Sequence, residues 1–263
     1  MRMEKNTINV RGVNFFDVDM EEALDICRGF LSEDRCHVIH TPNAEIVQLC
    51  IEQPEYYELI NSADLTVPDG AGVILASKIL RTPLKKGKVA GIELSENLLR
   101  EAAAKSVGVF FLGGKPGVAE KAAQKMEEKY PGLRVVGCND GFFKKVDTDG
   151  LAGEYLKNPA DFKEDAAVIQ KINDSGAQIL LVCLGVPKQE IWMKAHRGEL
   201  SVKIAGGFGG SFDIFAGEIR RAPKAFIALN LEWLYRLILE PKRIGRMMKL
   251  PKFVFGTMFS RRR

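Results

Sequence analysis

Short apolar runs alternate with amphipathic stretches along the first 205 residues of this 263-residue chain. Runs rich in β-branched and aromatic residues predict strands near 7–13, 36–41, 65–67, 108–112, 133–138, 178–184 and 202–205. Between them, apolar residues recur at helical spacing, for example over 20–31, 91–105 and 166–175. Strands that alternate with helices in this way predict an α/β fold with a mostly parallel, Rossmann-like sheet and helices on both faces.

The pattern changes twice. Residues 144–165 are polar and contain Gly and Pro, which predicts a surface excursion. After a glycine-dense stretch at 206–213 the chain predicts helices without strands, and Phe226, Leu229, Trp233 and Leu237 are expected to share one helical face. Pro241 is expected to restart a basic helix. We therefore predict an α/β core at 1–217 and a helical, basic appendage at 218–263.

Composition and charge narrow the class of protein. A hydrophobic content of 46% with 27% charged residues is typical of a globular chain. The five cysteines are an odd number without paired spacing, which favours buried thiols in a reducing compartment. The first residues lack the apolar core of a signal peptide, and no apolar run approaches the roughly 20 residues that span a bilayer. These features predict a cytoplasmic protein.

The positive charge is concentrated at the end of the chain. Residues 218–263 carry 12 Lys and Arg against 3 acids, a net +9, whereas residues 1–217 carry 26 against 31, a net −5. Arg236, Arg243 and Arg246 recur at helix-compatible spacing beside Trp233 and Tyr235. A basic, aromatic, amphipathic segment is typical of a membrane interface, and it is also typical of a solvated helix packed on the body. Nucleic acid fits less well because the body is acidic.

Two predicted strands end in polar residues. Asp69 follows the strand that stops at Pro68 and precedes a helix, where open α/β sheets place ligand-binding side chains and where Asp is also a good helix cap. Thr41 ends another strand, where its hydroxyl is suited to a sugar or phosphate or to a structural bond. Asn43 is expected to cap the next helix. These strand ends predict a shared crevice.

Two further turns follow buried strands. Gly113 and Gly114 form a glycine turn before a helix, which suits a phosphate and is also ordinary turn chemistry. Gln189 lies in the first turn of a helix after Gly185-Val186-Pro187, where its amide would face the crevice or solvent. The chain lacks G-x-G-x-x-G, a P-loop and G-x-S-x-G. Its three histidines show no metal-ligand spacing.

Together these stretches resemble the WecG/TagA/CpsF glycosyltransferases of bacterial cell-surface polymer synthesis, in the right order over nearly the whole chain. The residues that carry the resemblance are Thr41-Pro42-Asn43-Ala44-Glu45, Pro68-Asp69-Gly70-Ala71-Gly72, Val89-Ala90-Gly91-Ile92-Glu93-Leu94, Phe111-Leu112-Gly113-Gly114, Asp140-Gly141-Phe142-Phe143, Gly185-Val186-Pro187-Lys188-Gln189-Glu190, Arg221-Ala222-Pro223, Leu231-Glu232-Trp233-Leu234-Tyr235-Arg236 and Glu240-Pro241-Lys242-Arg243. The sequence departs from the family at 146–164, which looks long, and at Lys88, where an arginine is expected.

The resemblance implies an inverting, metal-independent transfer of N-acetylmannosamine from UDP-N-acetylmannosamine to undecaprenyl-diphosphate-N-acetylglucosamine, with a β-1,4 product, in wall teichoic acid linkage-unit synthesis. Asp69 would be the catalytic base. Arg236, Arg243 and Arg246 would fold over the crevice and stabilise the departing UDP. Thr41, Asn43, Lys88, Gly113, Gly114 and Gln189 would bind substrate. The polyprenyl acceptor implies peripheral association with the inner face of the cell membrane, where the appendage would complete the active site.

Three alternatives compete with this interpretation. The same fold could use another UDP-sugar, such as the uronate of N-acetylmannosamine. The chain could be a nucleotide-binding or membrane-surface protein without turnover. A dinucleotide oxidoreductase is disfavoured by the missing G-x-G-x-x-G. A homo-oligomer is compatible with the apolar face at 226–238.

Overall fold

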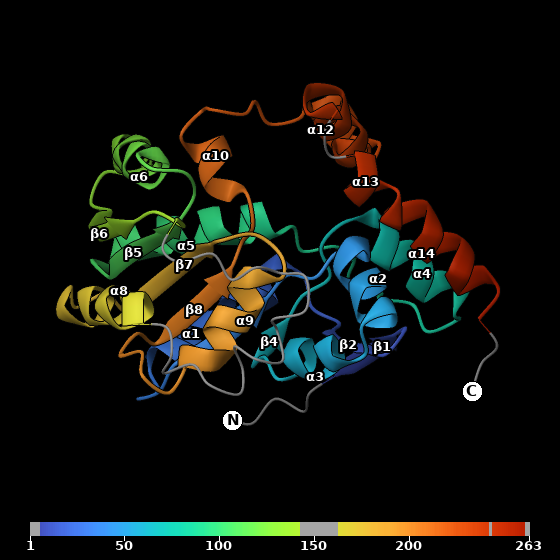
Figure 1. Cartoon of the computed structure of the whole chain (residues 1–263), viewed down its shortest axis with the longest axis horizontal. Coiled ribbons are helices and arrows are strands. Elements are labelled where there is room, and N and C mark those ends of the chain that lie inside the picture. The colour runs from blue at the N-terminus through green and yellow to red at the C-terminus, as the bar shows by residue number, and fades with distance from the viewer. Residues whose placement is uncertain (1–5, 143–162, 242–243, 261–263) are drawn as a thin grey trace.

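A six-stranded parallel sheet forms the centre of the molecule, with strand order β4-β3-β8-β7-β5-β6 (Figure 1). The computed structural model describes residues 6–142, 163–241 and 244–260. The predicted excursion at 146–164 therefore lies almost wholly outside the described residues. The strands are β3 (His37–His40), β4 (Leu65–Thr66), β5 (Gly108–Gly113), β6 (Arg134–Asn139), β7 (Ile179–Cys183) and β8 (Ile204–Gly207).

Helices cover both faces of the sheet, as the sequence predicted. Alternate residues of β5 point to opposite faces, so that Phe110 and Leu112 join one buried cluster while Val109 and Phe111 join the other. The helices are α1 (Met20–Leu31), α2 (Ala44–Glu52), α3 (Glu55–Asn61), α4 (Ala71–Ile79), α5 (Gly91–Lys105), α6 (Val118–Lys129), α8 (Lys163–Asp174), α9 (Lys188–His196), α10 (Ser211–Phe215), α11 (Lys224–Ala228), α12 (Glu232–Leu239), α13 (Ile244–Met247) and α14 (Lys249–Met258).

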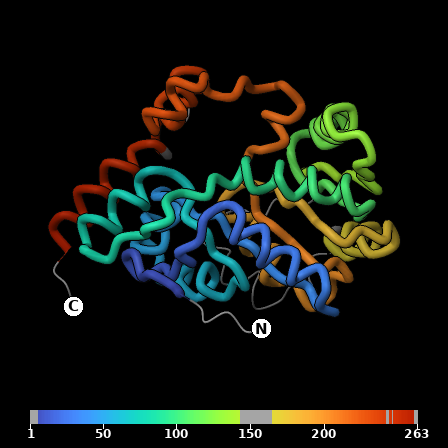
Figure 2. The backbone as a smooth tube through the Cα atoms, turned by 180° about the vertical axis from the view of Figure 1, so that it is seen from behind, coloured from blue at the N-terminus to red at the C-terminus, as the bar shows by residue number. Residues whose placement is uncertain are grey.

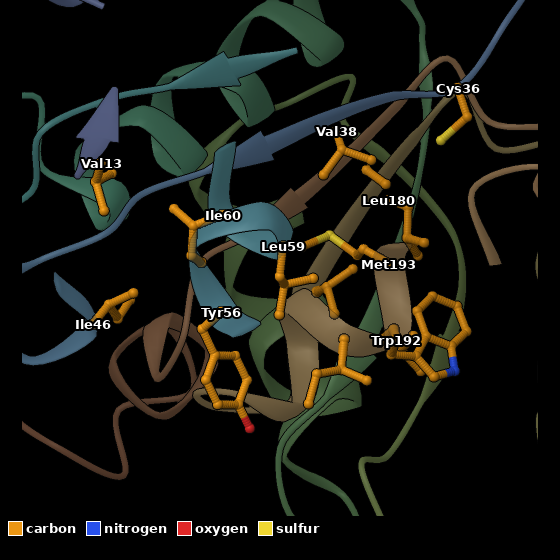
Figure 3. Packing of buried hydrophobic residues seen from close by; sticks show 14 of the residues in the cluster. Val13, Cys36, Val38, Ile46, Tyr56, Leu59, Ile60, Leu180, Trp192 and Met193 are labelled. Carbon is orange, nitrogen blue, oxygen red and sulfur yellow. The ribbon is translucent and has the colours of Figure 1, made fainter. Parts of the chain in front are cut away.

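The first of these clusters lies between the sheet and α3, α8 and α9. Figure 3 shows Tyr56 and Leu59 of α3 near Trp192 and Met193 of α9, with Leu180 of β7 behind them. The second cluster lies under α1, α5, α6 and α10. Because both faces are covered, the central strands β5, β7 and β8 are buried and apolar at every position rather than alternating.

The N-terminal strand prediction was wrong in one respect. Residues 7–13 are not one strand: β1 (Thr7–Val10) turns back into β2 (Val13–Phe16) as an antiparallel hairpin. Arg11 and Gly12 both have positive φ, at 55° and 92°, which is the backbone of a tight hairpin turn. Tyr57 lies directly against Gly12, so a side chain there would collide with the ring.

The continuous helical face predicted at 226–237 was also wrong. Helix α11 ends at Ala228, and Asn230 adopts a left-handed φ of 59° before α12 begins at Glu232. Asn tolerates this conformation better than most residues and commonly ends helices. Leu229 is consequently 68% exposed instead of continuing an apolar stripe with Trp233.

The end of the chain returns to the core. After α10 the chain crosses to α11, α12 and α13, and α14 then runs beside α2 and α4 (Figures 1 and 2). Phe253 of α14 is fully buried in the cluster that also contains Val47 of α2 and Val73 of α4. Gly72 permits the close approach, because a Cβ there would lie 2.7 Å from Leu250 Cδ1 and 2.9 Å from Ala44 Cβ. The core boundary at residue 217 stays a prediction.

Candidate active site

A cleft of about 660 Å³ lies at the carboxyl ends of the parallel strands. Each of the six strands contributes a residue from the loop that follows it, which is where open α/β sheets bind ligands. The C-terminal segment forms the opposite wall. The residues that follow the strands in the cleft are Thr41, Asp69, Gly114, Gly141, Gly185 and Gly209, and those of the opposite wall include Glu232, Trp233, Arg236 and Leu250.

Asp69 lies in this cleft and does not cap a helix. The N-cap of α4 is Gly70, with a φ of 83° and no side-chain cap. The Asp69 carboxylate instead accepts a hydrogen bond from the backbone N–H of Gly91, at the start of α5. Because that helix end carries partial positive charge, it orients and stabilises the carboxylate. The Asp69 carboxylate therefore does not cap the helix that follows it, and it lies in the wall of the cleft.

Burial raises the pKa of the Asp69 carboxyl to about 6, from an ordinary value of 3.8. The neighbouring Glu232 carboxylate contributes to this rise in pKa, since two like charges disfavour ionisation. The Gly91 N–H, Lys88 and Arg236 oppose both effects. The resulting group is ionised at neutral pH but binds a proton much more strongly than a solvated carboxylate.

Lys88 faces this carboxylate from the loop before α5. Val89 N–H donates to the Pro68 carbonyl at 2.9 Å, which holds the segments carrying Lys88 and Asp69 side by side. The Lys88 ammonium donates to Glu232 Oε2 of α12 at 3.2 Å. Lys88 was predicted from the sequence as a site residue, and Glu232 was not. Glu232 lies in the stretch 231–236 that carries the family resemblance, four residues before Arg236, which puts both on one side of a helix.

Arg236 also reaches the cleft, where it lies against Gly210. A Cβ at Gly210 would stand 3.6 Å from Arg236 Nη2 and 3.5 Å from Asp213 Oδ2, so both side chains approach this glycine. Of the three predicted arginines, Arg243 lies outside the described residues, as does the side chain of Arg246. The structure therefore places one guanidinium of the three in the cleft.

Thr41 and Asn43 line the cleft and also have local structural roles. The Thr41 hydroxyl donates to the Gly207 carbonyl at 3.0 Å, which joins the ends of β3 and β8. A Cβ at Gly91 would lie 2.8 Å from Thr41 Oγ1, so Thr41 packs on the start of α5. Asn43 caps α2 by accepting from the N–H groups of Glu45 and Ile46, which confirms that prediction.

Gln189 is buried in the wall of the cleft. Its Oε1 accepts from the Gly209 N–H at 3.0 Å, and its Nε2 donates to Glu190 Oε1 at 2.7 Å. The amide group thus fixes the glycine-rich loop after β8 rather than facing solvent. In this structure Gln189 shapes the cleft through that loop.

The glycine turn after β5 serves strand packing. Gly113 has a φ of 130°, and a Cβ there would lie 2.3 Å from the Cys183 carbonyl oxygen of β7. The Gly114 N–H donates to the same oxygen at 3.1 Å. The N–H that was expected to meet a phosphate is therefore already used, although Gly114 and Lys115 do line the cleft.

The cleft also has an apolar end that the sequence did not reveal. Leu75 of α4 and Leu250 and Val254 of α14 line it together with Ile46 and Met247. Further apolar side chains of the C-terminal segment are exposed, among them Phe255 at 61% and Phe259 at 83%. The described part of the chain contains no helix long and apolar enough to cross a bilayer.

The chain is similar in sequence to known proteins over most of its length. Residues 8–263 match the family described as glycosyl transferase WecG/TagA/CpsF. A protein from Bacillus spizizenii is 33% identical over 229 residues, covering 87% of this chain and 81% of that protein. One from Staphylococcus aureus is 32% identical over 258 residues, covering 97% and 94%. Both are named N-acetylglucosaminyldiphosphoundecaprenol N-acetyl-beta-D-mannosaminyltransferase.

Proposed function

This chain belongs to the WecG/TagA/CpsF family of glycosyl transferases, and on that premise we propose which sugar it moves and to what. The donor is UDP-N-acetylmannosamine, and the acceptor is the 4-hydroxyl of N-acetylglucosaminyl-diphosphoundecaprenol. Transfer inverts the anomeric centre and forms a β-1,4 bond in wall teichoic acid linkage-unit synthesis. The names of the similar proteins support the acceptor and the transferred sugar.

The proposal depends mainly on Asp69 as the catalytic base. In a single displacement, the acceptor oxygen bonds to C1 of the donor sugar while the bond from C1 to the UDP oxygen breaks. The hydroxyl proton passes to Asp69, whose pKa of about 6 leaves it ionised at neutral pH and basic enough to accept. The Gly91 N–H holds the carboxylate in the cleft.

The departing UDP gains negative charge, which needs positive partners. Lys88 and Arg236 line the same cleft as Asp69 and supply such charge. We include Arg243 and Arg246 in this proposal because they follow in the same basic segment. The transfer needs no metal ion in this scheme, and activity should survive addition of EDTA.

The apolar end of the cleft supports a lipid-linked acceptor. Leu75, Leu250 and Val254 lie at one end, and the exposed Phe255 and Phe259 continue along α14. Apolar side chains beside Lys249 and Lys252 suit an anionic bilayer surface. We therefore place the enzyme peripherally on the inner face of the cell membrane.

UDP release from UDP-N-acetylmannosamine, with and without the lipid-linked acceptor, tests the proposal. Wild-type protein should release UDP only with acceptor, and Asp69→Asn should lower the rate by about 10²–10⁴-fold because the base is lost. Asp34→Asn, which changes a fully exposed aspartate, is the matched control. Undiminished release by Asp69→Asn would refute the proposed base, and release from the uronate donor alone would refute the proposed donor.

The pH dependence gives a second check. Only ionised Asp69 accepts a proton, so kcat/KM should fall as pH drops through about 6. At pH 5 it should stand about tenfold below its plateau, as for one group with that pKa. A profile that stays flat down to pH 4.5 would contradict the assignment.

A further inference from the structure

The C-terminal segment brings an acid, as well as arginine, to the candidate active site. Glu232 begins α12, and Arg236 follows one turn later on the same side of the helix. Both line the cleft, as does Trp233 between them, which is 38% exposed. An acid is unexpected in a cleft wall that faces a diphosphate, because it repels that ligand. Its position therefore needs an explanation.

The contact between Glu232 and Lys88 explains why an acid lies in this wall of the cleft. Glu232 Oε2 accepts from Lys88 Nζ at 3.2 Å, across 144 positions of sequence. Both side chains are mostly withdrawn from solvent, with 24% of Lys88 and 33% of Glu232 exposed. The hydrogen bond between Val89 and Pro68 keeps the Lys88 segment next to Asp69. Lys88 thus acts electrostatically on the Asp69 carboxylate and bonds the carboxylate of Glu232 on α12.

We propose that Glu232 is a positioning residue of the transfer reaction, which holds the Lys88 ammonium away from Asp69 and so keeps Asp69 free to act as base. This inference rests on the proposed function. Without Glu232, Lys88 would turn to Asp69, whose carboxylate it already influences electrostatically. A base paired with an ammonium has a lower proton affinity and removes a hydroxyl proton less well.

The groups with the largest effect on the charge of Asp69 come from three parts of the chain, and Glu45, Lys115, Asp213, Arg220 and Arg221 also line the cleft. Lys88 lies before α5, the Gly91 N–H opens α5, and Glu232 and Arg236 belong to α12. Of these groups, Glu232 alone disfavours the ionised form of Asp69. Removing its charge therefore acts in the same direction as releasing Lys88, and both lower the pKa of Asp69.

The pH profile of kcat/KM for Glu232→Gln tests the inference. We expect the plateau to fall and the acid limb to move to lower pH than in wild type. Glu232→Asp keeps the charge and should keep the limb in place while the plateau falls. Glu218→Gln is the control, because it removes another ion pair between the C-terminal segment and the core, with Lys121, away from the cleft. It should change neither quantity.

A second readout needs no turnover. Carbon-13 NMR of labelled aspartate carboxyls, with Asp69→Asn to identify the resonance, follows protonation of Asp69 in the free enzyme. The midpoint should be lower in Glu232→Gln than in wild type. An unchanged midpoint, or an equal shift in Glu218→Gln, would overturn the inference. If the wild-type protein released no UDP with any donor, the proposed function would be refuted instead. The titration of Asp69 can be measured in either case, because it needs no turnover.

Discussion

At the scale of single residues, Asp69 occupies surroundings that oppose its charge. Burial and Glu232 raise its pKa to about 6. A folded-state pKa above the unfolded one stabilises the fold at low pH, and this contribution is lost as pH rises through about 6. Asp69→Asn should therefore be no less stable than wild type above pH 6. A loss of activity in Asp69→Asn can therefore be attributed to the missing base and not to unfolding of the protein.

Gly113→Ala tests whether Gly113 is needed for the packing of β5 against β7. The added Cβ would meet the Cys183 carbonyl oxygen at 2.3 Å, and φ is 130°, so we expect a loss of about 1–3 kcal/mol in unfolding free energy. Urea denaturation measures it. Gly29→Ala, at an open position in the last turn of α1, should instead gain about 0.5–1 kcal/mol. Equal stability of Gly113→Ala and wild type would contradict the packing role.

The sequence could predict which polar residues lie at the strand ends, but it could not predict which residues they contact. Asp69, Thr41 and Gln189 were placed in the crevice because each follows an apolar run. Glu232 was missed because its partner Lys88 lies 144 positions away and no local pattern links them. The bonds that occupy Gly114 and Gln189 were equally hidden, since both join separate strand ends.

At the scale of elements, long and strongly periodic segments were predicted well. Helix α1 spans Met20–Leu31 and α5 spans Gly91–Lys105, as expected from their apolar spacing. The errors occurred where one residue with positive φ divides a segment: Gly12 inside the N-terminal hairpin and Asn230 between α11 and α12. Hydrophobic periodicity does not register such a break, because the residues on either side keep their apolar character.

Gly72→Ala tests the packing of α14 on α2 and α4. In a free helix this change is favourable by up to about 1 kcal/mol, but here the Cβ would meet Ala44 and Leu250 below 3 Å. We expect α14 to be displaced, with faster amide exchange over 249–258 and lower transfer activity. Gly256→Ala, which adds a Cβ in open space on α14, is the control. Unaltered exchange in Gly72→Ala would refute this packing constraint.

At the scale of the whole molecule, the cleft depends on strand order. Residues that follow β3, β4, β5, β6, β7 and β8 converge there because all six strands run parallel. Alternating strands and helices predicted such a sheet but not the order β4-β3-β8-β7-β5-β6. The return of α14 to the core was likewise not foreseen, since its buried Phe253 lies among exposed apolar neighbours.

Vesicle sedimentation tests the proposed membrane surface. Wild type should bind vesicles rich in phosphatidylglycerol, and binding should weaken with added salt. Phe255→Ser with Phe259→Ser should weaken it roughly tenfold or more, because burying one Phe contributes about 1.5–3 kcal/mol. Phe142→Ser removes a similarly exposed aromatic outside the C-terminal segment and is the control. Equal loss in both variants would contradict a specific surface.

The segment that carries Glu232 and Arg236 is anchored in the core at both ends, by Phe212 and Ala216 on one side and Phe253 on the other. Tethering of this kind gives a short segment an effective concentration on the order of millimolar at its binding surface. A separate peptide spanning 224–241 could therefore replace the tethered one only near that concentration. Arg236 is therefore present in the cleft of every molecule without a separate binding step.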